Sequence, residues 1–68
     1  MDILKARDET IRIICENQLK AGTLPPNGIY HRMAELESLD DTCLRLIEIE
    51  SRYLLHKATQ LAVELRKN

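Results

Sequence analysis

Hydrophobic residues recur at helical spacing in the first third of the chain. At 100° per residue, one face of a helix collects the apolar side chains Ile3, Leu4, Ile11, Ile14, Cys15 and Leu19. Asp2 suits the start of such a helix, because acidic caps favour that end. Lys20, Ala21 and Gly22 then supply a basic last turn and a glycine for the left-handed cap position. The pattern predicts a helix over about residues 2–21.

The next segment is a predicted loop that contains two adjacent prolines. Each proline pushes the residue before it to extended geometry, so Leu24, Pro25 and Pro26 should be stiff. Asn27 and Gly28 offer a turn and a helix cap together. We therefore expect a rigid Pro-Pro loop over residues 22–28.

From residue 29 to about residue 67 the chain contains neither proline nor glycine and is predicted to be helical. Ser38 and Asp41 have the spacing of a capping box, although Glu or Gln is preferred at the second position. The segment either breaks or kinks near residues 38–41, into helices over about 29–37 and 40–67, or continues as one helix. The break is preferred, because an unbroken helix of roughly 57 Å could not be covered by a first helix of roughly 30 Å. The fold prediction is an all-α antiparallel helical hairpin that forms a single domain, 1–68.

The last segment carries an apolar stripe for an antiparallel neighbour. Alternating spacings of three and four residues are typical of a helix-packing seam, as in coiled coils. The stripe consists of Cys43, Leu44, Ile47, Leu54, Ala58, Leu61, Ala62 and Leu65. The first helix is its expected occupant, through Ile11, Ile14 and Leu19. Glu50 and Ser51 interrupt the stripe. Either a polar contact there fixes the register, or the seam drifts and both side chains reach water, and the second interpretation is preferred.

A second apolar group lies about 90–120° around the same helix. Its members are Leu39, Leu46, Ile49 and Tyr53. Burying a side chain of leucine or isoleucine size is worth roughly 1.5–3 kcal/mol, and contiguous exposed apolar patches usually mark interaction sites. The group therefore favours an interface with a protein partner or with a second copy of the chain. The alternative is coverage from within, by Met33 and Leu36 folding back from the 29–37 segment.

Size and charge narrow the functional classes. A chain of 68 residues is near the lower limit for folding alone, where oligomerisation often adds stability. Ten basic and eleven acidic residues give a net charge of −1 without a basic stripe, so nucleic-acid binding is not expected. The first residues lack the pattern of a signal peptide, and no apolar run is long enough to span a membrane. The expected location is the cytoplasm, with both cysteines as free thiols.

The residues with metal-binding or catalytic potential are far apart in the sequence. Zinc modules supply ligands as close pairs, whereas every gap between Cys15, His31, Cys43 and His56 exceeds ten residues. Both cysteines lie on apolar stripes, where a free thiol behaves as a small hydrophobic side chain. Neither histidine has a local nucleophile or carboxylate arrangement for acid–base catalysis. We expect no enzyme activity, no catalytic residues, no metal and no cofactor.

Part of the chain resembles a bacterial protein family. The features that carry this resemblance are residues 19–22 (Leu-Lys-Ala-Gly), a short proline-containing loop, Tyr30, and Leu36-Glu37 leading into an aliphatic helix. Together they look like the small co-chaperones of type III secretion needle subunits. The resemblance covers about residues 15–55. Members of that family are helical hairpins that help a larger helical-repeat chaperone keep the needle subunit unpolymerised. The resemblance implies a stabilising hairpin docked on a helical partner.

These observations together predict a non-enzymatic helical module for protein–protein interaction. It is an adaptor or co-chaperone that binds its partner through the Leu46, Ile49 and Tyr53 side of the last helix. The alternative is a self-contained homodimeric regulator that acts on transcription components or nucleic acid.

Overall fold

The computed structural model describes residues 3–67, and it describes side chains for residues 6–66. Three α-helices and one short 3-10 helix make up this part of the chain: α1 (Ile3–Ala21), η1 (Pro26–Gly28), α2 (Ile29–Glu37) and α3 (Asp41–Lys67). No strand occurs in the described residues, so the all-α prediction is confirmed. Asp2, the expected cap of the first helix, lies outside them.

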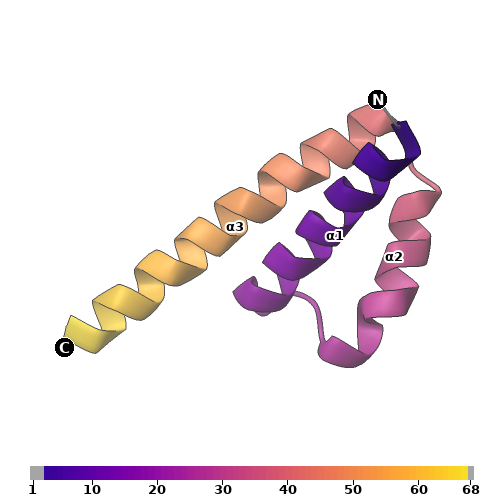
Figure 1. The fold of residues 1–68 in the computed structure, drawn as a ribbon. Helices are drawn as coiled ribbons and strands as arrows, with labels where there is room; N and C mark the ends of the chain where they lie inside the picture. Colours follow the sequence, from indigo (N-terminus) through magenta and orange to yellow (C-terminus); the bar gives the residue numbers. More distant parts are fainter. Residues whose placement is uncertain (1–2, 68) are drawn as a thin grey trace.

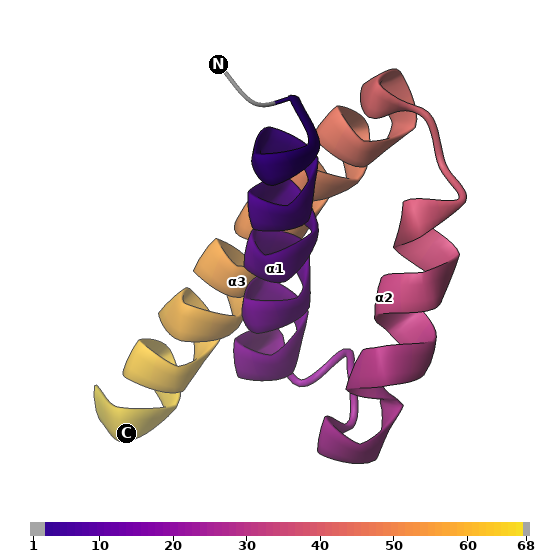
Figure 2. The same ribbon diagram turned by 45° about the vertical axis from the view of Figure 1, so that its right-hand side comes forward.

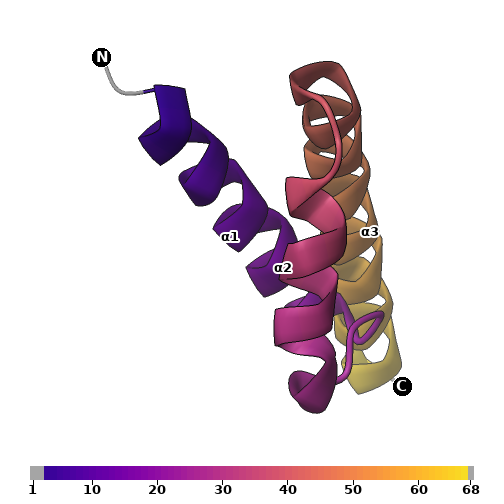
Figure 3. The same cartoon turned by 90° about the vertical axis from the view of Figure 1, so that its right-hand side faces the viewer.

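The three helices run down, up and down, so that α1 and α3 point in the same direction (Figures 1 and 2). Two contacts join these helices, between Arg7 and Asp41 and between Asn17 and Ser51. In both pairs the residue numbers differ by 34. A constant difference in residue number across two helices means that the helices are parallel. The predicted antiparallel pairing of the first helix with the last one is therefore wrong. The return helix α2 supplies a second reversal, and α3 crosses α1 at an angle (Figure 3).

The break that separates α2 from α3 falls where the sequence suggested. The helix α2 ends at Glu37, and the Ser38 hydroxyl donates a hydrogen bond of 2.7 Å to the Glu35 carbonyl. The Asp40 carboxylate accepts a hydrogen bond of 2.8 Å from the backbone N–H of Cys43, which makes Asp40 the amino-terminal cap of α3. The cap is thus Asp40, two residues beyond the expected Ser38.

The loop between α1 and α2 has a defined path. Gly22 adopts φ +80°, the left-handed conformation that ends many helices, and its N–H bonds to the Leu19 carbonyl at 3.2 Å. Pro25 is extended, with φ −71° and ψ 148°, and Pro26–Gly28 form the short 3-10 turn that leads into α2. The loop also contributes Leu24 to the core, where only 9% of its surface is exposed.

The core is small, and α1 supplies half of its buried residues. These are Ile11, Ile14 and Cys15 from α1, Leu24 from the loop, Leu36 from α2 and Leu44 from α3. Leu19, Ile29, Met33, Leu39 and Ile47 pack against them and are partly buried. Leu36 is fully buried there, so α2 covers α1 and is not folded over the outer side of α3.

A polar pair, of which Ser51 is buried and Asn17 is partly buried, lies where α1 meets α3. Ser51 is 1% exposed, and its hydroxyl donates to the Glu48 carbonyl at 2.7 Å and accepts from the Asn17 amide at 3.2 Å. The preferred interpretation, that Ser51 reaches water, is wrong, although Glu50 is exposed as expected. A small side chain lets the two helices approach, and the hydrogen bond fixes their register, as a buried polar residue does in a coiled coil.

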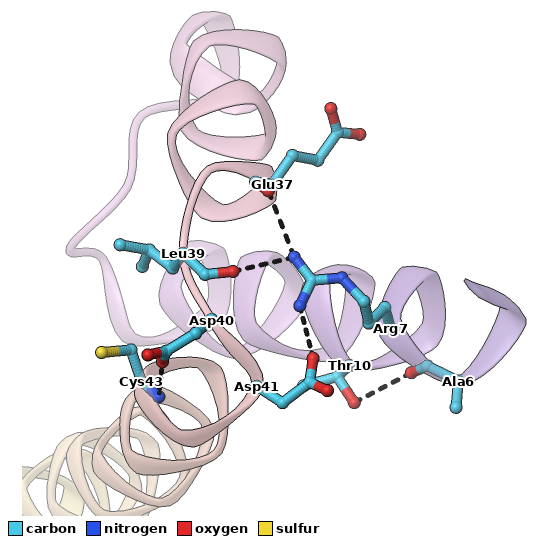
Figure 4. A network of polar contacts seen from close by, with 8 residues as sticks. All are labelled: Ala6, Arg7, Thr10, Glu37, Leu39, Asp40, Asp41 and Cys43. Atoms are coloured by element: carbon cyan, nitrogen blue, oxygen red, sulfur yellow. Dashed lines mark hydrogen bonds and ion pairs between the residues drawn. The ribbon is translucent and has the colours of Figure 1, made fainter. Parts of the chain in front are cut away.

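The side chain of Arg7 joins all three helices at one end of the molecule (Figure 4). Its Nη2 donates to the carbonyls of Glu37, at 3.1 Å, and Leu39, at 2.9 Å, while Nη1 pairs with the Asp41 carboxylate. Carbonyls at the end of a helix have no partner within the helix, so the guanidinium satisfies the Glu37 carbonyl that α2 leaves open, together with the Leu39 carbonyl of the connecting segment. We call this group of contacts the Arg7 junction.

Replacing Arg7 with alanine should lower the free energy of unfolding by about 2 kcal/mol, because hydrogen bonds from a charged donor are lost at a partly buried site. Arg7→Lys should recover little of it, since an ammonium group lacks the planar fork that reaches three acceptors. Arg12→Ala is the matched control. Arg12 lies exposed on the same helix, 3.8 Å and 3.9 Å from its acidic neighbours, and its removal should change stability by under about 0.5 kcal/mol. Urea unfolding followed by circular dichroism measures each value, and equal losses for the two alanine variants would contradict the assigned role of Arg7.

The Asp40 cap should make stability depend on acid pH. The hydrogen bond from the Cys43 backbone is the main reason that the pKa of Asp40 lies below its ordinary value of 3.8. A lowered pKa in the folded state means that the charged cap stabilises the fold above pH 3.8 and that this contribution is lost as the pH falls through the folded value. Asp40→Asn keeps a capping oxygen but cannot titrate. Its urea midpoint should therefore fall less than that of the unmodified protein between neutral pH and pH 3, and parallel curves would rule out this linkage.

Candidate partner-binding surface

Three large apolar side chains are exposed on the side of α3 that faces away from α1. Leu46, Ile49 and Tyr53 lie about 140–200° around the helix from the buried Leu44, and their exposed fractions are 63%, 57% and 59%. We call these three residues the outer patch. Their spacing of three and four residues aligns them along the helix, so that they form one contiguous strip.

The surroundings of the outer patch are polar. The ammonium group of Lys57 lies 5.7 Å from the centre of the Tyr53 ring, a distance at which a cation is attracted to the face of an aromatic ring. A shallow depression beside the patch is lined by Asp41, Thr42, Arg45, Leu46 and Ile49. An apolar strip with a charged margin has the composition of a protein interface, which combines an apolar centre with a polar rim.

Leu39, the fourth residue expected in this group, lies elsewhere. It belongs to the segment between α2 and α3, and its side chain packs against the core and is partly buried. The helical projection that placed it with Leu46 assumed that the helix continues through residue 39. Because α3 starts only at Asp41, that projection does not hold for Leu39.

The expected intramolecular seam is present over only part of its length. Ile11 and Ile14 are buried, Leu19 and Ile47 are packed against the core, and Ala58 is partly buried. Leu44 is buried as well, and the structure leaves the other five expected members exposed: Cys43, Leu54, Leu61, Ala62 and Leu65.

The parallel register explains why the seam is incomplete. At a constant difference of 34 positions, Ala21 at the end of α1 lies opposite residue 55 of α3. The helix α3 therefore continues past α1 for residues 56–67, roughly 18 Å at 1.5 Å per residue. Cys43 is exposed for a different reason, since it lies about 100° around the helix from Leu44.

The last part of α3 extends away from the other two helices, as Figure 1 shows. We call residues 54–66 the C-terminal arm. The molecule measures 46 × 25 × 17 Å and has a radius of gyration of 13.5 Å, whereas a compact chain of this length would have roughly 11 Å. The difference reflects the arm, on which Leu61 and Leu65 are 57% and 67% exposed.

The two thiols are poorly suited to act as nucleophiles. Burial raises the pKa of Cys15 above 9.0, and a hydrogen bond with the Asp40 carboxylate raises the pKa of Cys43 in the same direction. Since the thiolate is the reactive form, both groups are held in the unreactive form at neutral pH.

Within residues 3–67, no cluster of three or more His, Cys, Asp or Glu side chains could hold a metal ion. None of the described helices is long and apolar enough to cross a membrane.

A groove also lies between α1 and the start of α3. Its lining residues are Ala6, Arg7, Thr10, Asp41, Leu44, Arg45 and Glu48. Arg7 and Asp41 pair with each other within it, and Thr10 donates to the Ala6 carbonyl at 3.0 Å. These polar groups are already engaged in holding the helices together, so the groove belongs to the Arg7 junction.

Comparison with known proteins gave no match to any family model, to any curated protein or to any solved structure.

Sequence reasoning identified the outer patch but missed the free part of the seam and the Arg7 junction. One signal for the free seam was present, because Ile47, Ser51, Leu54, Ala58, Leu61 and Leu65 follow an unbroken alternation of four and three residues. In the parallel register α1 ends opposite residue 55, whereas the alternation continues to Leu65, ten positions farther along α3. No sequence signal distinguished Arg7 from the other arginines.

The carboxylate beside Cys43 should control the reactivity of that thiol. Asp40→Asn removes the negative acceptor, so the pKa of Cys43 should fall towards 9.0 and alkylation near neutral pH should become faster. The measurement is the rate of modification by iodoacetamide as a function of pH, in a Cys15→Ser background. The midpoint of the profile should shift to lower pH. An unchanged midpoint with a uniformly higher rate would instead indicate increased access to the thiol.

Proposed function

We propose that this chain is a non-enzymatic helical adaptor or co-chaperone that binds a helical segment of another protein through the outer patch. The observation that carries the proposal is the exposure of Leu46, Ile49 and Tyr53 in one line along α3. Neither α1 nor α2 covers them, so the alternative in which residues 29–37 fold back over this side loses its support.

The geometry of the patch favours a helical partner. A straight helix that presents apolar side chains at spacings of three and four residues accepts the matching ridge of another helix. Tyr53 is the strongest candidate for an anchor, because aromatic side chains dominate the energetics of protein interfaces. Lys57 and Arg45 at the margin suit a partner that carries acidic residues beside its apolar stripe.

The role agrees with the resemblance to co-chaperones of type III secretion needle subunits. A small helical protein that covers an apolar stripe on a larger helical partner would prevent that stripe from associating with other copies. The resemblance includes Tyr30 and residues 36–37, which belong to α2, whereas the outer patch lies on α3. The proposed contact therefore rests on the exposure, spacing and charged margin of the outer patch, and not on the residues that carry the resemblance.

The double variant Ile49→Glu/Tyr53→Glu should abolish binding of the partner while the helical content remains unchanged. Two charges placed in the centre of an apolar contact should remove about 2 kcal/mol or more of binding free energy. Because both positions are exposed, the free energy of unfolding should change by under about 0.5 kcal/mol. A photo-crosslinking amino acid placed at position 53 in cells of the source organism should give a discrete adduct that identifies the partner by mass spectrometry.

Tyr30 provides the matched control, since it is 87% exposed on α2 and lies outside the patch. The same crosslinker at position 30 should give no such adduct, and Tyr30→Glu should bind the identified partner normally. If the double variant binds as well as the unmodified protein, the outer patch is not the contact surface.

A further inference from the structure

We propose that the C-terminal arm pairs in antiparallel orientation with the arm of a second copy of this chain. The apolar residues of this surface are separate from the outer patch, and only Lys57 borders both. The proposal does not depend on the function proposed above. Leu54, Leu61 and Leu65 lie about 110° around α3 from the centre of the outer patch. One helix therefore presents two apolar surfaces to two different sides.

The arm continues an interface that is already formed within the molecule. Ile47 and Ser51 occupy the part of the stripe that meets α1, and Leu54, Ala58, Leu61 and Leu65 extend the same alternation of four and three residues. The helix α1 ends opposite residue 55. Beyond that residue, none of the described helices packs against the stripe. A partner helix laid along the arm would meet the same pattern of positions that α1 meets.

The charges beside the stripe favour a second copy in antiparallel orientation. Lys57 and Glu64 lie on the same edge of the stripe, seven residues apart, with opposite charge. Two such helices can pair antiparallel as in a coiled coil, with the centre of the apolar stripe between residues 59 and 60. The flanking residue Lys57 of each copy then lies nearest to the flanking residue Glu64 of the other, and this pair occurs twice. In the described part of the chain neither residue takes part in an internal ion pair.

The same register also matches the apolar positions. Ala58 of one copy meets Leu61 of the other, so that a small residue faces a large one. Leu54 meets Leu65 beside the end of α1. On the second edge of the stripe, Leu55 lies opposite Ala62. A parallel pairing would instead set Lys57 beside Ala62 and leave both charges without an opposite partner.

The contact is short, which determines how tight the dimer should be. Pairing over residues 54–65 extends over roughly 17 Å of helix, so the buried surface should fall below the roughly 1,200 Å² typical of stable complexes. We therefore expect a reversible dimer whose fraction rises with protein concentration in the micromolar range.

Sedimentation velocity over a range of concentrations tests the pairing. The unmodified protein should shift from monomer to dimer, and Leu61→Glu should remain monomeric throughout while its thermal unfolding stays nearly unchanged, because Leu61 is 57% exposed in the monomer. Leu46→Glu is the matched control, since it places the same charge on the outer patch and should leave dimerisation intact. A monomer at every concentration, or a dimer that Leu61→Glu does not weaken, would overturn the proposal.

A charge exchange tests the orientation. Lys57→Glu alone and Glu64→Lys alone each place like charges opposite each other twice, so both should weaken the dimer several-fold at low salt. The double exchange Lys57→Glu/Glu64→Lys should restore it. Failure of the double exchange to restore the dimer would overturn the antiparallel register.

The exposed Cys43 allows the orientation to be measured directly. In a Cys15→Ser background, spin labels on Cys43 of the two copies should lie roughly 50 Å apart in the antiparallel dimer. In a parallel dimer they would lie near the roughly 10 Å spacing of packed helices. A short distance would contradict the proposal even if Leu61 proved necessary for dimerisation. Loss of the dimer in Leu61→Glu, with normal partner binding by that variant, would separate this surface from the outer patch.

Discussion

The arrangement of this molecule depends on the Arg7 junction. The junction holds the end of α2, the connecting residues and the first turn of α3 against α1 with a single guanidinium group. It thereby fixes the point at which α3 starts, at the same end of the molecule as the start of α1. Once both helices start at the same end, the longer one must extend past the shorter one, and the exposed arm follows from that difference in length.

Local signals in the sequence were sufficient to locate the helices. Gly22 with its left-handed backbone and the two prolines after it end α1 whatever the rest of the chain does. The break before α3 was also predicted, because polar residues that bond to their own backbone cluster at residues 38–41. These effects act over three or four residues, so they can be read without knowledge of the fold.

The relative direction of the helices and the exposure of individual residues could not be predicted in the same way. Leu54 and Leu61 look like core residues by periodicity, and whether they are covered depends on where α1 ends in space. Ser51 looks like an interruption of the seam, yet its size and its bond to Asn17 make it the place where α1 and α3 are held in register. Such outcomes depend on contacts 34 positions apart, which a pattern along one helix does not contain. The common face of Leu46, Ile49 and Tyr53 could be predicted, because their position opposite Leu44 is a property of α3 alone, and all three are exposed.

The free length of α3 has a consequence for how order is distributed along the chain. A helix of about twelve residues is marginal in water by itself, because the first turn is costly to form. The arm is helical as an extension of turns that α1 already stabilises, so each successive turn rests on the one before it and has fewer tertiary contacts to hold it. Opening should therefore begin at the far end of the arm and progress towards residue 55, as a gradual loss of backbone hydrogen bonds rather than an all-or-none step. A molecule bound to the arm would raise the free energy of these local openings. Binding would therefore slow amide hydrogen exchange in the last turns of α3 even where the global stability of the fold changes little.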